Sequence, residues 1–202
     1  MKRDYPARTL LLMVIAIAIF AIPKVSSFLI YDREAILSGE IWRLITGNLV
    51  HFTPAHLLFD LTAIGVAGWI IETRGYPHFW GLAGLSACSV GAGLLVGMPE
   101  VSQYGGLSGV AIGMTVYASL CGMRENGLWQ RVCTALFLLI IVKVALEFLT
   151  GQSLSTTMAN TPFIPVPLSH AMGAIAGSLV ALTNKDLVLS NRPLKNPRYA
   201  LQ

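Results

Sequence analysis

Ser108 and His170 are the two residues whose chemistry stands out in a chain of largely apolar segments. A serine hydroxyl is a weak nucleophile until a neighbouring base accepts its proton, and histidine suits that role because it changes charge near neutral pH. The two residues could therefore form a Ser-His dyad that attacks a carbonyl group. Ser108 alone has a plainer interpretation, since a serine between glycines commonly caps a helix. The presence of His170 favours the catalytic interpretation.

A second group of residues could stabilise the negative charge that such an attack creates. Ser108 follows Gly105-Gly106-Leu107, a loop that can bend tightly and present backbone N–H groups. A helix that begins there would direct its unpaired N–H groups and positive dipole end at an oxyanion beside Ser108. His56 and Asp60, one helical turn apart, could complete this oxyanion hole. An ionised carboxylate only accepts hydrogen bonds, so we expect Asp60 to be protonated or turned toward a cation.

Three further polar residues are candidates for substrate contact or for support of the dyad. Lys143 and Glu147 are four positions apart in an apolar stretch, a spacing that favours an ion pair within one helix. Alternatively, Lys143 faces Asp60 or the substrate path and selects an anionic or C-terminal feature of the substrate. A Ser-Lys dyad through Lys143 is also possible, but it would leave His170 unexplained. We expect His51 to anchor the adjoining loop by hydrogen bonding.

The composition indicates which kind of molecule must position these residues. The chain has 202 residues, of which 54% are hydrophobic and 12% charged. A soluble domain carries roughly 25% charged residues, so a secreted scaffold, a disordered tail and a nucleic-acid binder all fit poorly. The three cysteines show neither paired nor metal-ligand spacing, and we interpret them as small core hydrophobes. The chain is predicted to be one integral membrane domain in the lipid bilayer.

We predict an all-α, polytopic membrane protein built as a six-transmembrane-helix bundle over residues 9–183. Each span needs about 20 mainly apolar residues. The segments are Thr9 to Ile30, Phe52 to Glu72, Phe79 to Met98, Gly106 to Met123, Trp129 to Thr150 and Pro165 to Leu182. Residues 1–8 form the N-terminus, and the polar tail covers residues 184–202.

The basic residues predict how the bundle is oriented. Ten of the 14 fall on one side, three on the other and Lys143 within a helix; the ten are Lys2, Arg3, Arg8, Arg74, Arg124, Arg131, Lys185, Arg192, Lys195 and Arg198. The positive-inside rule then makes both termini cytoplasmic. With this orientation the second, fourth and sixth helices begin outside. The first turns carry His51, His56 and Asp60 on the second helix, Ser108 on the fourth, and Ser169 and His170 on the sixth. We expect these side chains to lie in one shallow layer that opens to the outer side.

Glycines predict that the fourth and sixth helices lie close together. Gly109 and Gly113 share one face of the fourth helix, and Gly173 and Gly177 share a face of the sixth with His170. Faces of small residues let two backbones approach closely, as a hydrogen bond between Ser108 and His170 requires.

These residues, taken in order, resemble the rhomboid intramembrane serine proteases of the bacterial six-helix type. The motifs that carry the resemblance are Trp42-Arg43, His51 with His56, Glu72 and Arg74, Gly106-Leu107-Ser108-Gly109, and His170 with Gly173 and Gly177. The resemblance implies that Ser108 is the nucleophile, His170 the general base, and His56 with the Ser108 N–H part of the oxyanion hole. It also implies hydrolysis of a peptide bond in or beside a transmembrane segment of a membrane-anchored protein, in the bacterial inner membrane and without metal or cofactor.

Two departures from that family point to a diverged branch. Asp60 stands where rhomboids commonly have an asparagine, and Ile112 where many have a tyrosine. The rhombosortases, which process C-terminally anchored surface proteins, are the suggested branch. A proteolytically inactive rhomboid-like binding or quality-control protein would share the fold, but such proteins usually lack the Ser or the His. A small transporter or channel should show an inverted repeat, and the sequence shows none. The sequence leaves the oligomeric state open.

Overall fold

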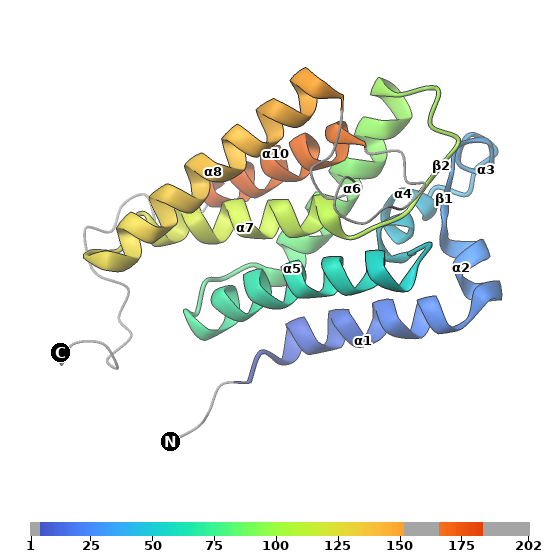
Figure 1. The fold of residues 1–202 in the computed structure, drawn as a ribbon. Helices are drawn as coiled ribbons and strands as arrows, with labels where there is room; N and C mark the ends of the chain where they lie inside the picture. Colours follow the sequence, from blue (N-terminus) through green and yellow to red (C-terminus); the bar gives the residue numbers. More distant parts are fainter. Residues whose placement is uncertain (1–4, 152–165, 184–202) are drawn as a thin grey trace.

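The helical character predicted from the sequence is confirmed. A computed structural model describes residues 5–151 and 166–183 of the chain (Figure 1). Its larger helices are α1 (Ala7–Ala21), α5 (Pro54–Thr73), α6 (Phe79–Gly97), α7 (Ser108–Gly122), α8 (Leu128–Thr150) and α10 (Pro167–Thr183). Smaller elements gather at the right-hand end of Figure 1: α2 (Pro23–Leu29), α3 (Arg33–Leu37), α4 (Arg43–Thr46), the 3-10 turn η1 (Gly47–Leu49), β1 (Tyr31–Asp32) and β2 (Gln103–Tyr104). The two strands are antiparallel, with Tyr31 opposite Tyr104.

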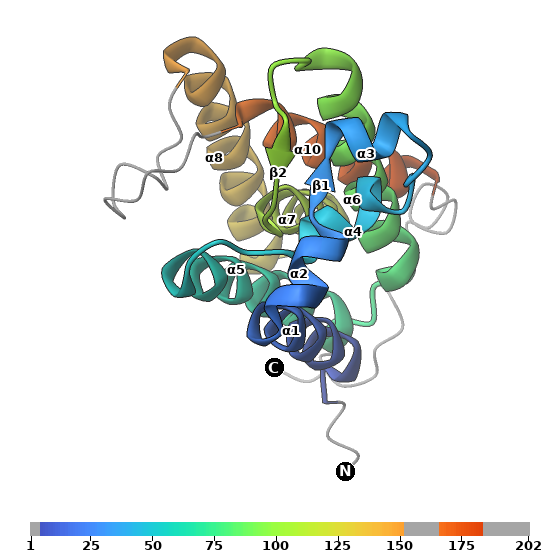
Figure 2. The same ribbon diagram turned by 90° about the vertical axis from the view of Figure 1, so that its right-hand side faces the viewer.

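Helix α7 is the centre of the bundle. It packs against α5, α6, α8 and α10, and the view in Figure 2 shows these helices around it. Eleven of its 15 residues are buried, from Gly109 near its start to Gly122 at its end. Several of them are glycine or alanine, which leaves room for neighbouring backbones. The first residue of this central helix is Ser108, so the serine is fixed by packing on all sides of α7.

The predicted close approach of the fourth and sixth helices is confirmed by α7 and α10. A Cβ atom built on Gly173 would lie 1.9 Å from the carbonyl oxygen of Gly109, and one built on Gly177 would lie 2.1 Å from that of Gly113. Real side-chain atoms do not tolerate such distances, so these positions admit only glycine in this packing. The helix pair that carries Ser108 and His170 is therefore held at backbone contact.

The first predicted span is wrong as a single helix. Helix α1 ends at Ala21, and α2 begins at Pro23 after a bend of 108°. A proline inside a helix removes one hydrogen bond and clashes with the preceding turn, but it is well suited to the first position of a new helix. The apolar run continues across this break, and the run alone suggested one helix to Ile30.

The number of membrane spans stays a prediction. Helices α5, α6 and α8 are long and apolar enough to cross a membrane, and the bent α1–α2 pair passes the same test as one broken span. Helices α7 and α10, with 15 and 17 residues, are shorter apolar helices. Six spans would require both short helices and the bent pair to be inserted.

Contacts at one end of the bundle join the start of α1, the end of α5 and the segment after α7. The sequence predicts all three on the cytoplasmic side. The carboxylate of Glu72 accepts from the backbone N–H groups of Arg8 and Thr9, at 3.1 and 2.7 Å. Arg74 forms a 2.6 Å ion pair with Glu125 after α7. This end is opposite the start of α7, as the proposed orientation requires. Residues 1–4, 152–165 and 184–202, with the basic residues that they carry, lie outside the described residues.

Candidate active site

Ser108 and His170 lie in hydrogen-bond contact, although they are 62 residues apart in sequence. Ser108 is the first residue of α7, His170 belongs to the first turn of α10, and the serine Oγ is 3.1 Å from His170 Nε2. The His170 residue is 5% exposed, whereas Ser108 is only partly buried. This arrangement gives a shielded imidazole next to a hydroxyl that a substrate can reach.

The opposite nitrogen of the His170 ring contacts helix α8. Its Nδ1 lies 2.6 Å from Glu147 Oε2 and 3.2 Å from Lys143 Nζ. Lys143 also donates to Glu147 Oε1 at 2.6 Å, which confirms the predicted ion pair within the helix. The contact of both residues with His170 was missed. No sequence signal pointed to it, because Lys143 and Glu147 already satisfy each other within one helix.

Asp60 is the hydrogen-bond acceptor that holds the serine loop. Its Oδ2 accepts from the Leu107 N–H at 2.6 Å and lies 3.1 Å from His51 Nε2 and 3.4 Å from His56 Nε2. The residue is 5% exposed. This geometry favours an accepting, loop-fixing role for Asp60 over the neutral donor role in an oxyanion hole. The protonation state of Asp60 stays a prediction.

His51 is one of the residues that contact Asp60. The residue precedes α5 rather than lying in its first turns, because the helix begins at Pro54 with Thr53 as its N-cap. The two ring nitrogens of His51 face Leu49 O and Asp60 Oδ2, each at 3.1 Å. Both neighbours are oxygen acceptors, so an N–H on either ring nitrogen has an acceptor within hydrogen-bond distance. His51 thereby ties the loop before α5 to Asp60, as expected of an anchoring residue.

Gly106 and His56 face each other across the loop that ends at Ser108. Gly106 has a φ of +135°, and a Cβ atom at this position would lie 2.7 Å from His56 Nε2 and 3.2 Å from Asp60 Oδ2. Only glycine combines this backbone conformation with this approach. His56 is thus held close to the backbone just before Ser108.

Tyr104 closes the other side of this loop and was not singled out from the sequence. Its hydroxyl donates to Gly106 O at 3.3 Å. Burial raises the pKa of Tyr104 to about 12, so its phenol stays protonated and able to donate at neutral pH. The strand pairing of Tyr104 with Tyr31 fixes its position.

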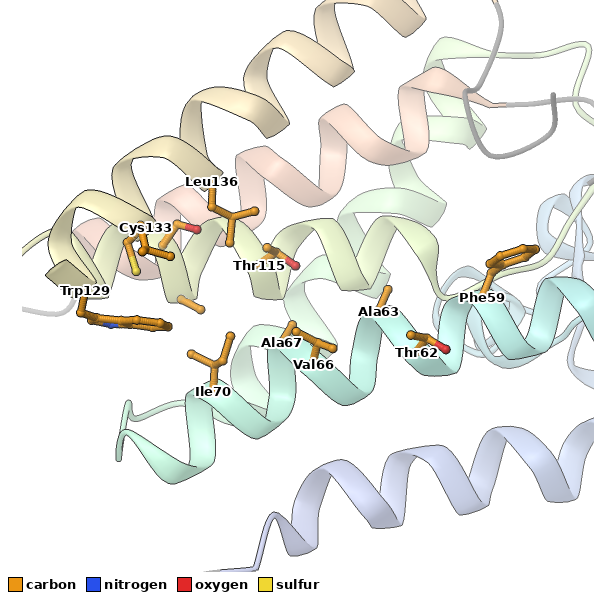
Figure 3. Close-up of a pocket in the computed structure, with 13 residues that line it drawn as sticks. Phe59, Thr62, Ala63, Val66, Ala67, Ile70, Thr115, Trp129, Cys133 and Leu136 are labelled. Carbon is orange, nitrogen blue, oxygen red and sulfur yellow. The ribbon is translucent and has the colours of Figure 1, made fainter. Parts of the chain in front are cut away.

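A sideways-open apolar groove runs between α5, α7 and α8 (Figure 3). Its lining reaches from Trp129 and Cys133 on α8 along α5 to Phe59. Phe59 lies at the end of the groove where α7 begins (Figure 3). Among the residues that the structure describes, no cluster of three His, Cys, Asp or Glu side chains could hold a metal ion.

Comparison with known proteins identifies the family. Residues 38–185 match the Rhomboid domain. The chain is 27% identical over 179 residues to the rhomboid protease GlpG of Salmonella choleraesuis (strain SC-B67), and equally to that of Salmonella typhimurium (strain LT2). Each alignment covers 86% of this chain and 59% of the relative, so the chain spans somewhat less than two thirds of the relatives' length. The site residues from His51 to His170 all lie within the matched range, and the chain is an integral membrane protein that belongs to the Rhomboid family.

Proposed function

We propose that this protein is an intramembrane serine endopeptidase that hydrolyses a peptide bond in or next to a transmembrane segment of membrane-anchored proteins. The observation that carries the proposal is the 3.1 Å contact between Ser108 Oγ and His170 Nε2 at the adjoining N-terminal ends of α7 and α10. The relatives' name, rhomboid protease, supports the same activity.

The contact suggests a two-stage acyl transfer. Ser108 Oγ attacks the scissile carbonyl carbon while His170 Nε2 takes the hydroxyl proton, and the carbonyl electron pair moves to oxygen. The tetrahedral intermediate collapses with cleavage of the C–N bond, and His170 gives its proton to the leaving amine. Water then attacks the acyl-serine and loses a proton to His170, which passes that proton to Ser108 Oγ as the ester bond breaks. The products are an amine and a carboxylic acid, and the enzyme is regenerated without a cofactor.

The start of α7 and the His56 side chain form the proposed oxyanion hole. The first N–H groups of a helix have no acceptor within it, and those at Ser108 and beyond face the reacting centre. The Leu107 N–H is already used by Asp60 Oδ2, so Asp60 fixes the loop while the next N–H groups remain available. Gly106 lets His56 approach this position. We assign His56 and the Ser108 N–H as donors, and Gly106 and Asp60 as the residues that place them.

The apolar groove in Figure 3 supports a membrane-embedded substrate. Its lining is almost wholly apolar and opens to the side of the bundle, where lipid would contact α5 and α8. An apolar segment of a membrane-anchored protein fits this surface, and its end near Phe59 would approach Ser108. Processing of C-terminally anchored proteins by a rhombosortase-like enzyme is the substrate class that we favour. The departure at Asp60 supports that branch.

We further propose six inserted helices, with α1 and α2 as one broken span and α7 and α10 as short central spans. Both termini are then cytoplasmic, and the Ser108 end of the bundle faces the outside of the bacterial inner membrane. The gathering of Arg8, Arg74 and Arg124 at the opposite end supports this orientation.

Two measurements on the protein in liposomes test the activity. A reporter domain fused to one apolar helix is the cleavage substrate, and a fluorophosphonate probe labels an activated serine independently of substrate choice. We expect cleavage and labelling by the unchanged protein and loss of both in Ser108→Ala and His170→Ala. Ser178→Ala is the matched control, because Ser178 lies on α10 and donates to Ala174 O. Equal labelling and cleavage in all four proteins would contradict the proposal.

A further inference from the structure

We propose that Glu147 completes a Ser108–His170–Glu147 triad as a positioning residue, and that Lys143 holds the Glu147 carboxylate in place behind it. This inference rests on the proposed function and adds a third group to its Ser-His pair. The three side chains come from α7, α10 and α8, and they form a continuous chain of contacts: 3.1 Å from Ser108 to His170 and 2.6 Å from His170 to Glu147.

The proton on the His170 ring decides whether the serine can react. A carboxylate only accepts hydrogen bonds, so the 2.6 Å contact with Glu147 places a proton on Nδ1. A neutral ring then has no proton on Nε2, which is free to accept the proton of Ser108. If Nδ1 instead accepted from Lys143, Nε2 would carry the proton and could not act as the base.

Lys143 competes for the same nitrogen but lies farther away. Its Nζ is 3.2 Å from His170 Nδ1 and 2.6 Å from Glu147 Oε1. A lysine ammonium has no acceptor, so Nδ1–H and Nζ–H cannot bond each other. Glu147 therefore serves both neighbours: Oε1 accepts a hydrogen bond from Lys143, and Oε2 accepts one from His170. The tautomer that carries its proton on Nε2 becomes favourable only when Glu147 no longer accepts hydrogen bonds from both Lys143 and His170.

The burial of Glu147 makes its contacts with His170 and Lys143 necessary. The Glu147 side chain is 0% exposed and that of His170 7%, whereas Lys143 is 25% exposed. A buried carboxylate needs a charged partner and hydrogen bonds. Lys143 supplies the charge in the resting protein. When His170 takes the proton of Ser108, the new imidazolium lies directly against Glu147, so the carboxylate also stabilises the charge that develops during attack.

Glu147→Gln tests the assignment because it keeps the shape and removes one acceptor. The amide oxygen must face Lys143, which only donates, so the amide N–H₂ faces Nδ1 and selects the unreactive tautomer. We expect kcat to fall by up to about 10⁴-fold, the effect of the equivalent carboxylate-to-amide substitution in a serine-protease triad. KM should change by less than about threefold, because substrate binding is not the lost interaction.

The double variant Lys143→Met/Glu147→Gln separates tautomer control from packing. Without the ammonium, the amide can turn its oxygen to Nδ1 and restore the reactive tautomer, so the double variant should be about tenfold faster than Glu147→Gln alone. A purely structural role for Glu147 predicts the reverse, since the second substitution removes another contact. Glu72→Gln is the matched control: it weakens a carboxylate at the opposite end of the bundle and should leave kcat unchanged.

Failure of this inference is distinguishable from failure of the proposed function. If the unchanged protein neither cleaves the reporter nor reacts with the fluorophosphonate, the proposed function fails. If it does both, Glu147→Gln with kcat within about threefold, or a double variant no faster than the single one, overturns the triad. Should Glu147→Gln fail to fold, ¹⁵N NMR of His170 in the unchanged protein decides: a protonated Nδ1 supports the assignment, and an unprotonated Nδ1 overturns it.

Discussion

The Leu107 N–H donates a 2.6 Å hydrogen bond to Asp60 Oδ2, which ties α5 to the residue just before Ser108. A side chain 47 positions away in sequence thereby fixes the loop that aims the serine. The bond occupies one N–H that could otherwise stabilise an oxyanion, and it positions the backbone N–H groups that follow Leu107.

Two replacements of Asp60 should show whether activity depends on its hydrogen bond to the loop or on its charge. In Asp60→Ala the buried Leu107 N–H loses its acceptor, which costs about 1–3 kcal/mol in stability and should lower kcat about 100-fold as the loop shifts. In Asp60→Asn the amide oxygen still accepts from Leu107, so we expect kcat within about tenfold of the unchanged protein. Reporter cleavage and thermal unfolding in detergent measure both. Asp60→Ala as fast as Asp60→Asn would show that the loop does not depend on this bond.

His56 should act on the transition state and not on substrate binding. Loss of one oxyanion donor typically lowers kcat by about 10²- to 10³-fold, and we expect that loss with little change in KM for His56→Phe. The phenyl ring fills similar space next to Gly106 without an N–H donor. His78→Asn is the control, because His78 is exposed before α6 and has a φ of +66° that asparagine tolerates. Steady-state kinetics in liposomes distinguish the two parameters; a rise in KM alone would assign His56 to binding.

The glycine spacing made the central helix pair predictable from the sequence. Gly109 and Gly113 on one segment and Gly173 and Gly177 on another could only serve close packing, and the structure brings these faces together. The break at Pro23 was less predictable, because proline in an apolar segment either kinks one span or starts a second helix. The choice depends on the packing of α2, β1 and α3 at the bundle end, which no local pattern encodes.

The contact of Glu147 with His170 shows where a sequence pattern stops being informative. Lys143 and Glu147 satisfy each other within one helix, so their spacing calls for no third partner. Helix α8 is also apolar around most of its surface, so no hydrophobic stripe indicates which face points inward. The rotation of α8 about its own axis sets the contact with His170, and only the packed structure contains that rotation.

Gly106→Ala should inactivate the protein while leaving it folded. The substitution strains a residue with a φ of +135° and drives a Cβ to 2.7 Å from His56 Nε2, so His56 must move from the site. We expect at least about a 100-fold loss in kcat, comparable with loss of an oxyanion donor. Gly39→Ala is the matched control, because it has a φ of +111° but nothing within 4 Å of its Cβ position. The control carries the backbone strain alone; equal activity of the two variants would remove the argument for contact with His56.

Gly173→Ala should push α10 away from α7 and lower both stability and activity. The added Cβ would lie 1.9 Å from Gly109 O, and neither backbone can yield without moving its helix. Overpacking of a well-packed core costs about 1–3 kcal/mol, and backbone-to-backbone conflict belongs at the upper end of that range. Because His170 lies one turn before Gly173, the displacement should lengthen its 3.1 Å contact with Ser108 and reduce fluorophosphonate labelling. Gly84→Ala on α6 adds the same methyl group where nothing lies within 4 Å, so it should label and unfold like the unchanged protein. If Gly173→Ala matched that control, the Ser108–His170 contact would not depend on the close approach of the two helices.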